Sequence, residues 1–133
     1  YYDRWMAWRA ATLGGWVREV RSRITKVKPG IGLGLYAGSW YGEYAALGNN
    51  WAAEGVPAGF WFLDPRYRST GMAGLFDFVT TGCYYPTATI HDAFAKGLGI
   101  GQSVEAAGAL SNALVDNATW TYAGIALSDF KGD

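Results

Sequence analysis

The chain has 133 residues, half of them hydrophobic and 17% charged, so it has room for one packed domain and is unlike a disordered segment. Eleven basic residues balance eleven acidic ones, and a net charge of zero argues against nucleic acid or an anionic membrane as the main partner. Cys83 and His91 are the single cysteine and histidine, which excludes an internal disulfide and Cys- or His-paired metal sites. We therefore expect no metal and no cofactor.

The first predicted element is a helix over residues 5–28. Its apolar residues recur with a helical period on one face: Leu13, Trp16, Val17, Val20, Ile24 and Val27. Pro29 and Gly30 end it, because proline breaks the hydrogen-bond ladder and glycine accepts the turn. Residues 1–28 also hold seven of the eleven basic residues. We interpret them as a solvated helix face, with a phosphate-binding patch as the alternative.

Three short apolar runs follow and predict strands over residues 31–37, 76–81 and 120–127. The first reads as a strand that is buried on both faces, as in a parallel sheet. Residues 38–70 have no sustained period and predict a long connection of functional type, and a helical turn is expected near Met72. A helix starts after Ser103, a good N-cap residue. The glycine-rich runs at 30–34 and 97–101 lack the strand–turn–helix setting of a dinucleotide loop.

The order of helix, strand, loop, strand, loop, helix and strand predicts an α/β fold with a parallel sheet. The strands alone do not distinguish an open sheet from a barrel. The chain starts at Tyr1 without Met and stops at Asp133 shortly after a strand, so we expect both ends to be cuts through a larger protein. A (β/α)₈ barrel needs about 250 residues. We expect residues 1–133 to form a single segment, about half of such a barrel.

Aromatic residues cluster where the predicted strands end. Ligands of parallel α/β folds meet the carboxyl ends of the strands, and aromatic rings offer flat apolar faces on which sugars can stack. The expected binding residues for an oligo- or polysaccharide are Trp40, Tyr41, Tyr84, Tyr85 and Lys131. The alternative is that many of these rings are ordinary core packing.

Hydrolysis of a glycosidic bond generally needs two carboxyl groups. The candidates at the same end of the sheet are Glu43, Glu105 and Asp129. Glu105 has a competing role in the first turn of a helix, where the helix dipole favours a negative charge, and Asp129 could be a loop or capping residue. Asp77 falls inside a predicted strand and is interpreted as half of a structural ion pair.

Several runs of the chain together resemble a known group of proteins. They are WYGEY at 40–44, NWA at 50–52, TG at 70–71, LFDF at 75–78, TG at 81–82, SVE at 103–105 and KPGI at 28–31. In these runs the chain is similar to bacterial glycoside-hydrolase-like barrel proteins named after the α-amylase family. The resemblance implies a (β/α)₈ barrel that acts on O-glycosidic bonds and is secreted, either outside the cell or into the periplasm. It also implies that an acidic residue from a strand before Tyr1 takes part.

Two further functions remain open at this stage. The first is a non-catalytic carbohydrate-binding domain that kept the barrel and lost the chemistry. The second is a structural or interaction domain whose aromatic residues form a subunit contact.

Overall fold

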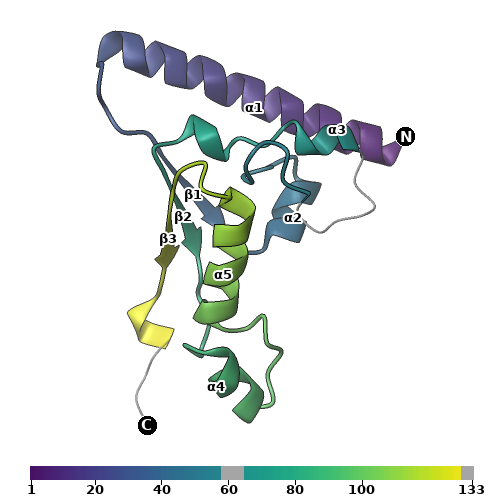
Figure 1. Ribbon diagram of the computed structural model, residues 1–133, viewed down its shortest axis with the longest axis vertical. Coiled ribbons are helices and arrows are strands. Elements are labelled where there is room, and N and C mark those ends of the chain that lie inside the picture. Colours follow the sequence, from purple (N-terminus) through teal and green to yellow (C-terminus); the bar gives the residue numbers. More distant parts are fainter. Residues whose placement is uncertain (58–64, 130–133) are drawn as a thin grey trace.

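The computed structural model describes residues 1–57 and 65–129 of the chain. In chain order the elements are α1 (Tyr2–Val27), β1 (Gly34–Gly38), α2 (Tyr41–Ala46), α3 (Pro65–Arg68), the 3-10 turn η1 (Ala73–Leu75), β2 (Phe78–Gly82), α4 (Ile90–Ala95), α5 (Val104–Val115), β3 (Trp120–Gly124) and the 3-10 turn η2 (Leu127–Asp129). Figure 1 shows α1 lying across one end of a small sheet, whose strands all point away from it.

The three strands form one parallel sheet in the order β1-β2-β3. This confirms the predicted α/β class and the parallel sheet, with each strand shifted by a few residues from its predicted range. The strands are in step, so that each ends on a glycine in one row: Gly38, Gly82 and Gly124. Helix α5 links β2 to β3 and packs against the sheet.

Helix α5 confirms the helix predicted after Ser103. The Ser103 side chain accepts a hydrogen bond from the backbone N–H of Ala106, as expected of an N-cap. At the other end Asp116 takes the left-handed conformation, which closes the last turn. Ala107 and Leu114 are buried against the sheet side of the helix, as the apolar spacing requires.

Helix α1 exists as predicted, but a different set of its residues is buried. Its buried residues lie in the first two thirds of the helix and are mostly small: Met6, Ala7, Ala10, Gly14 and Val17. The predicted stripe is wrong at Trp16, which is 62% exposed, and at Val27. The reason is that α2 and α3 contact α1 under its amino-terminal half, while its other half extends beyond them (Figure 1). Small side chains let the elements approach closely there.

Residues 38–57 and 65–70 contain more helix than the sequence indicates. They contain α2 and α3, and the structure also forms the short helix α4 after β2, which the sequence analysis missed. These helices have four to six residues, too few to show a helical period. Local capping stabilises α4, since the Thr89 hydroxyl accepts from the Asp92 N–H while the Asp92 carboxylate accepts from Thr89.

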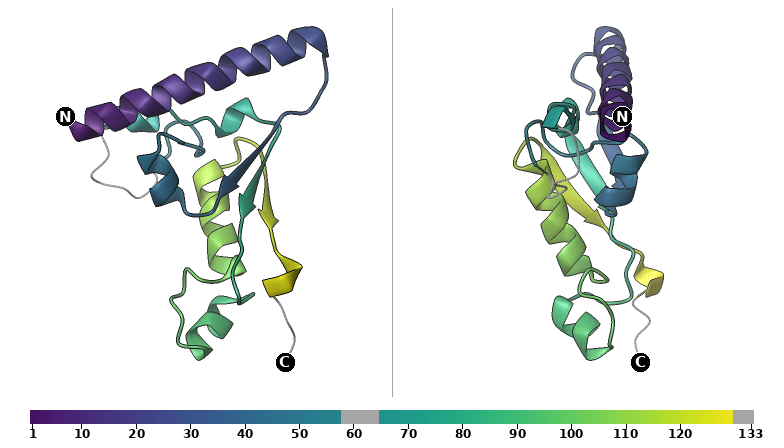
Figure 2. Two further views of the ribbon diagram at one scale, coloured as in Figure 1. Left: turned by 180° about the vertical axis from the view of Figure 1, so that it is seen from behind. Right: turned by 90° about the vertical axis from the view of Figure 1, so that its right-hand side faces the viewer.

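One face of the sheet is buried and the other is open within the described residues. Ala37, Val79 and Thr81 on the buried face are almost inaccessible. The opposite face carries Tyr36, Phe78, Trp120 and Tyr122, which are 41–73% exposed. The prediction that the first strand is buried on both faces is therefore wrong. The left view of Figure 2 shows α2 and α5 on one side of the sheet and α1 across its end.

Glycines let the aromatic rings of this open face lie flat across neighbouring strands. A Cβ atom at Gly34 would lie 2.2 Å from the ring of Phe78, and one at Gly82 would lie 2.8 Å from the Tyr36 hydroxyl oxygen. Larger residues at these positions would push the rings off the sheet. The result is an aromatic surface on which Phe78 and Tyr122 meet edge-on, and which we call the open aromatic face (Tyr36, Phe78, Trp120 and Tyr122).

The ion pair predicted for Asp77 is confirmed. Arg21 Nη2 lies 3.1 Å from Asp77 Oδ1, while Asp77 Oδ2 accepts from the N–H of Leu33 at 2.7 Å. Arg21 also donates to the carbonyl of Leu75. The N–H of Leu33 and the Arg21 guanidinium hold the pKa of the Asp77 carboxyl below its usual value. One carboxylate thus joins α1, the start of β1 and the start of β2.

We expect opposite effects on stability from two glycine-to-alanine changes. A Cβ atom at Gly71 would lie 2.5 Å from backbone atoms of Ala53, whereas one at Gly108 in α5 meets nothing within 4 Å. Gly71→Ala should lower the free energy of unfolding by about 1–3 kcal/mol through overpacking. Gly108→Ala should raise it by about 0.5–1 kcal/mol through helix propensity. Urea denaturation measures both, and an unchanged midpoint for Gly71→Ala would contradict the close approach of the two segments.

Candidate functional site

The predicted site residues lie at the carboxyl end of the sheet. All three strands run away from α1, so their last residues face the end of the molecule that carries α4 and η2 (Figures 1 and 2). Ligands of parallel sheets are bound at this end because the connections after the strands gather there. Lys131, one of the predicted binding residues, lies outside the described residues.

A cleft of about 280 Å³ opens at this end between the start of α2 and the first half of α5. It brings together four of the predicted site residues, namely Trp40, Tyr41, Glu43 and Tyr85. The other lining residues are mostly small or apolar: Ser39, Gly42, Gly101, Ala106, Ala107 and Leu110. We call this space the α2–α5 cleft.

The end of β1 shapes one wall of the cleft. A Cβ atom at Gly38 would lie 2.6 Å from both the Trp40 and the Tyr44 ring, so glycine is needed for these rings to pack over the strand end. Ser39 is buried, and its hydroxyl is 2.8 Å from the hydroxyl of Tyr85. The Trp40 ring remains 43% exposed. The cleft therefore has an accessible indole beside a fixed pair of hydroxyl groups.

Helix α5 supplies the opposite wall. Ala106, Ala107 and Leu110 follow one another along the helix face that borders the cleft. The backbone N–H groups of Val104 and Glu105 donate to the carbonyls of Thr87 and Ala88, which ties the start of α5 to the segment that follows β2. The end of β1 thus holds one wall of the cleft, and the segment after β2 holds the other.

Tyr41 is a core residue and differs from the exposed sugar platform that we expected. Its side chain is 1% exposed, and its ring meets Trp51 edge-on with the centroids 5.2 Å apart. The Tyr41 hydroxyl donates to Asn50 Oδ1 at 2.5 Å. Burial raises the pKa of the Tyr41 hydroxyl far above its usual value. Tyr41 forms part of the floor of the cleft and offers no free ring face.

Tyr84 lies outside the cleft, on the side of the open aromatic face. Its hydroxyl is hydrogen-bonded to the hydroxyl of Tyr36, and both side chains are about half exposed. This hydrogen bond and partial desolvation raise the pKa of Tyr36 to about 12. The predicted Tyr84–Tyr85 pair is therefore divided, because Tyr85 faces the cleft and Tyr84 faces the other side of the sheet.

The three predicted carboxylates occupy different positions. Glu43 lines the cleft, and its carboxylate makes no hydrogen bond or ion pair with any other described residue. Glu105 lies in the first turn of α5, and its Oε2 accepts from the backbone N–H of Ile90 at the start of α4, 2.8 Å away. Asp129 is the last residue of η2. Among the described side chains of this set, Glu43 lines the cleft and Glu105 does not.

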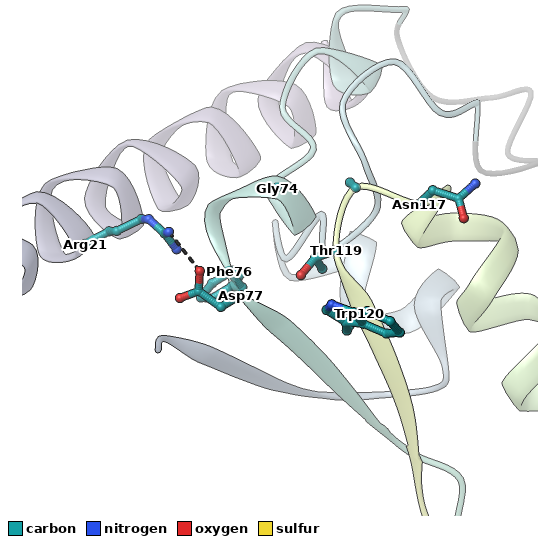
Figure 3. Close-up of a pocket in the computed structure, with 8 residues that line it drawn as sticks. Arg21, Gly74, Phe76, Asp77, Asn117, Thr119 and Trp120 are labelled. Carbon is teal, nitrogen blue, oxygen red and sulfur yellow. Dashed lines mark hydrogen bonds and ion pairs between the residues drawn. The ribbon is translucent and has the colours of Figure 1, made fainter. Parts of the chain in front are cut away.

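A second hollow, of about 560 Å³, lies at the amino end of the strands and was not anticipated from the sequence. Figure 3 shows the Arg21–Asp77 ion pair on one side of it and Thr119 and Trp120 on the other. Its two charged groups already bind each other and the backbone. Because the functional loops of parallel sheets lie at the carboxyl end, we assign the candidate site to the α2–α5 cleft.

Comparisons with protein-family models, with curated proteins and with solved structures found no match to this chain. Within residues 1–57 and 65–129, no helix combines the length and the apolar character needed to cross a bilayer. The same residues contain no group of three His, Cys, Asp or Glu side chains placed to hold a metal ion.

We expect the Tyr84→Phe variant to lower the pKa of Tyr36 from about 12 towards the ordinary value of about 10. The folded pKa is raised, so the stabilisation from this hydroxyl pair is present below about pH 10 and is lost as the pH rises through 12. Alkaline titration of ¹³C-labelled tyrosine ring carbons by NMR measures the shift. Tyr122→Phe is the control that should leave the pKa of Tyr36 unchanged, because Tyr122 lies on the same face and its hydroxyl binds no described residue.

Proposed function

We propose that the chain binds carbohydrate in the α2–α5 cleft. The observation that carries the proposal is the half-exposed Trp40 ring beside the Tyr85 hydroxyl and the unpaired Glu43 carboxylate. An indole face packs against the C–H face of a pyranose, and hydroxyl and carboxylate oxygens accept hydrogen bonds from sugar hydroxyls. The Ala and Leu wall of α5 gives a second apolar contact.

We further propose that this site belongs to a glycoside hydrolase that acts on O-glycosidic bonds. Glu43 is one carboxylate of the required pair, because it lines the cleft and its carboxylate is bound to no other described group. Glu105 and Asp129 are the candidates for the second carboxylate, since Glu105 is exposed at the same end of the sheet and η2, which ends at Asp129, follows β3 there. Non-catalytic carbohydrate binding is the alternative, favoured by the single carboxylate among the described residues of the cleft and by the Glu105 hydrogen bond to Ile90.

We also propose that the three strands are part of a larger (β/α)₈ barrel. In a barrel, helices cover the outer face of the sheet and side chains fill the inside. Helices cover one face of this sheet, while the open aromatic face is apolar and bears no charged residue. In addition, β1 and β3 each pair on one side only, and unpaired edges favour the addition of further strands. The resemblance seen in the sequence suggests an extracellular or periplasmic location for such a protein.

We expect Trp40→Ala to weaken glycan binding by about tenfold or more, because truncation of a central tryptophan in a binding site commonly costs that much. Trp16→Ala is the matched control, since Trp16 is similarly exposed but lies on α1 at the other end of the sheet. A glycan array identifies the ligand, and titration calorimetry measures the affinity of each variant. Equal affinity of both variants would place the binding site elsewhere, and a chain that binds no glycan would refute the proposal.

Hydrolysis is tested by replacing each candidate carboxylate with its amide. Glu43→Gln, Glu105→Gln and Asp129→Asn keep the side-chain shape but cannot act as acid, base or nucleophile. At least one of them should reduce the turnover of an active preparation by orders of magnitude, measured as reducing ends released. Full activity in all three variants would exclude these residues as the catalytic pair, and binding without product release would favour the non-catalytic alternative.

A further inference from the structure

Charge is divided between the two ends of the sheet. Seven of the basic residues lie on α1 or directly after it, and two more lie on α3, which packs against α1: Arg4, Arg9, Arg18, Arg21, Arg23, Lys26, Lys28, Arg66 and Arg68. At the carboxyl end, the acidic residues of the described segments are Glu43, Asp92, Glu105 and Asp129. The basic side chain of the described segments at this end is Lys96. Among the described residues the carboxyl end therefore carries more negative than positive charge, although the whole chain is neutral.

The α2–α5 cleft has the same sign of charge. Among the described residues that line the cleft, Glu43 is the only charged one, and none is lysine or arginine. No described cation neutralises Glu43, because none is hydrogen-bonded or ion-paired to its carboxylate. Proteins that bind carboxylate, sulfate or phosphate groups use Arg or Lys for that contact. The described lining of the cleft offers no such side chain.

We infer that the cleft selects glycans without acidic groups, that is, neutral sugars and amino sugars, and that Glu43 is the residue that sets this selectivity. The inference rests on the proposed carbohydrate function of the same cleft. A uronate or sulfate beside Glu43 would meet a like charge next to the apolar wall of α5. A neutral sugar would instead donate hydroxyl hydrogen bonds to the carboxylate, and a protonated amino sugar would gain an attractive contact as well.

The test compares glycans of one length that differ in charge. Two matched pairs cover both kinds of linkage: cellohexaose with β-1,4-glucuronate hexamer, and maltohexaose with α-1,4-glucuronate hexamer. A β-1,4-glucosamine hexamer adds the cationic case. Affinities are measured by calorimetry at low and at high salt on the full chain. Glu54→Gln, which removes an exposed acid from the other end of the molecule, is the charge-matched control for Glu43→Gln.

We expect at least one neutral hexamer to bind, and its acidic counterpart to bind at least about fivefold more weakly, the size of one like-charge contact in water. Glu43→Gln should reduce this difference in affinity between the neutral and the acidic hexamer, and high salt should reduce it as well. Glu54→Gln should leave the difference unchanged. An acidic hexamer that binds as well as its neutral partner overturns the inference, as does a difference that survives in Glu43→Gln. If no hexamer of any charge binds, the proposed carbohydrate function itself fails, a result distinct from the loss of selectivity.

Discussion

The buried side chain of Asn50 organises the part of the structure on which the candidate site depends. Its Oδ1 accepts from the Tyr41 hydroxyl, and its Nδ2 donates to the Tyr67 carbonyl and to Thr70 Oγ1. Its own backbone carbonyl accepts from the N–H of Met72. Four points between β1 and β2 are thus fixed to one residue, three of them through its side-chain amide. A buried amide without these partners would cost its full desolvation energy, so the segment has little choice of conformation.

This constraint reaches the cleft through α2. That helix has six residues and no side-chain cap, so its position comes from tertiary contacts rather than from its own helical stability. Tyr41 at its start is held by Asn50 and Trp51, and the neighbouring Trp40 and Glu43 are thereby presented to the cleft. The buried polar network and the exposed site are in this sense one structural unit. The facing helix α5 carries its own cap at Ser103 and does not need such support.

The sequence was sufficient to predict features that depend on a repeating hydrophobic pattern or on neighbouring residues. The three strands, α5 with its Ser103 cap and the structural role of Asp77 all follow from apolar runs, capping chemistry and the cost of an unpaired charge. It was insufficient for features that are determined by contacts between residues far apart in the chain. Nothing near Trp16 indicates that α1 packs through its amino-terminal half, and no local pattern shows that residue 105 binds residue 90.

The candidate site shows the same division. Sequence reasoning placed Trp40, Glu43 and Tyr85 at one end of the sheet because parallel strands end together, and the cleft contains all three. It could not separate Tyr41 from Trp40, since adjacent aromatic residues look equivalent until the helix start turns one inward and the other outward. It also could not divide Tyr84 from Tyr85, whose side chains leave the sheet on opposite sides.

The one-sided packing of α1 has a consequence for how the molecule opens. Its buried residues end at Val17, and beyond them the Arg21 contacts to Leu75 and Asp77 are the anchors that connect the helix to the sheet. Local opening needs only the free energy of the contacts that it breaks. The last turns of α1 should therefore exchange their amide hydrogens faster than the first turns do. The helix would then consist of a stably packed part and a part that unfolds locally, with Arg21 at the boundary between them.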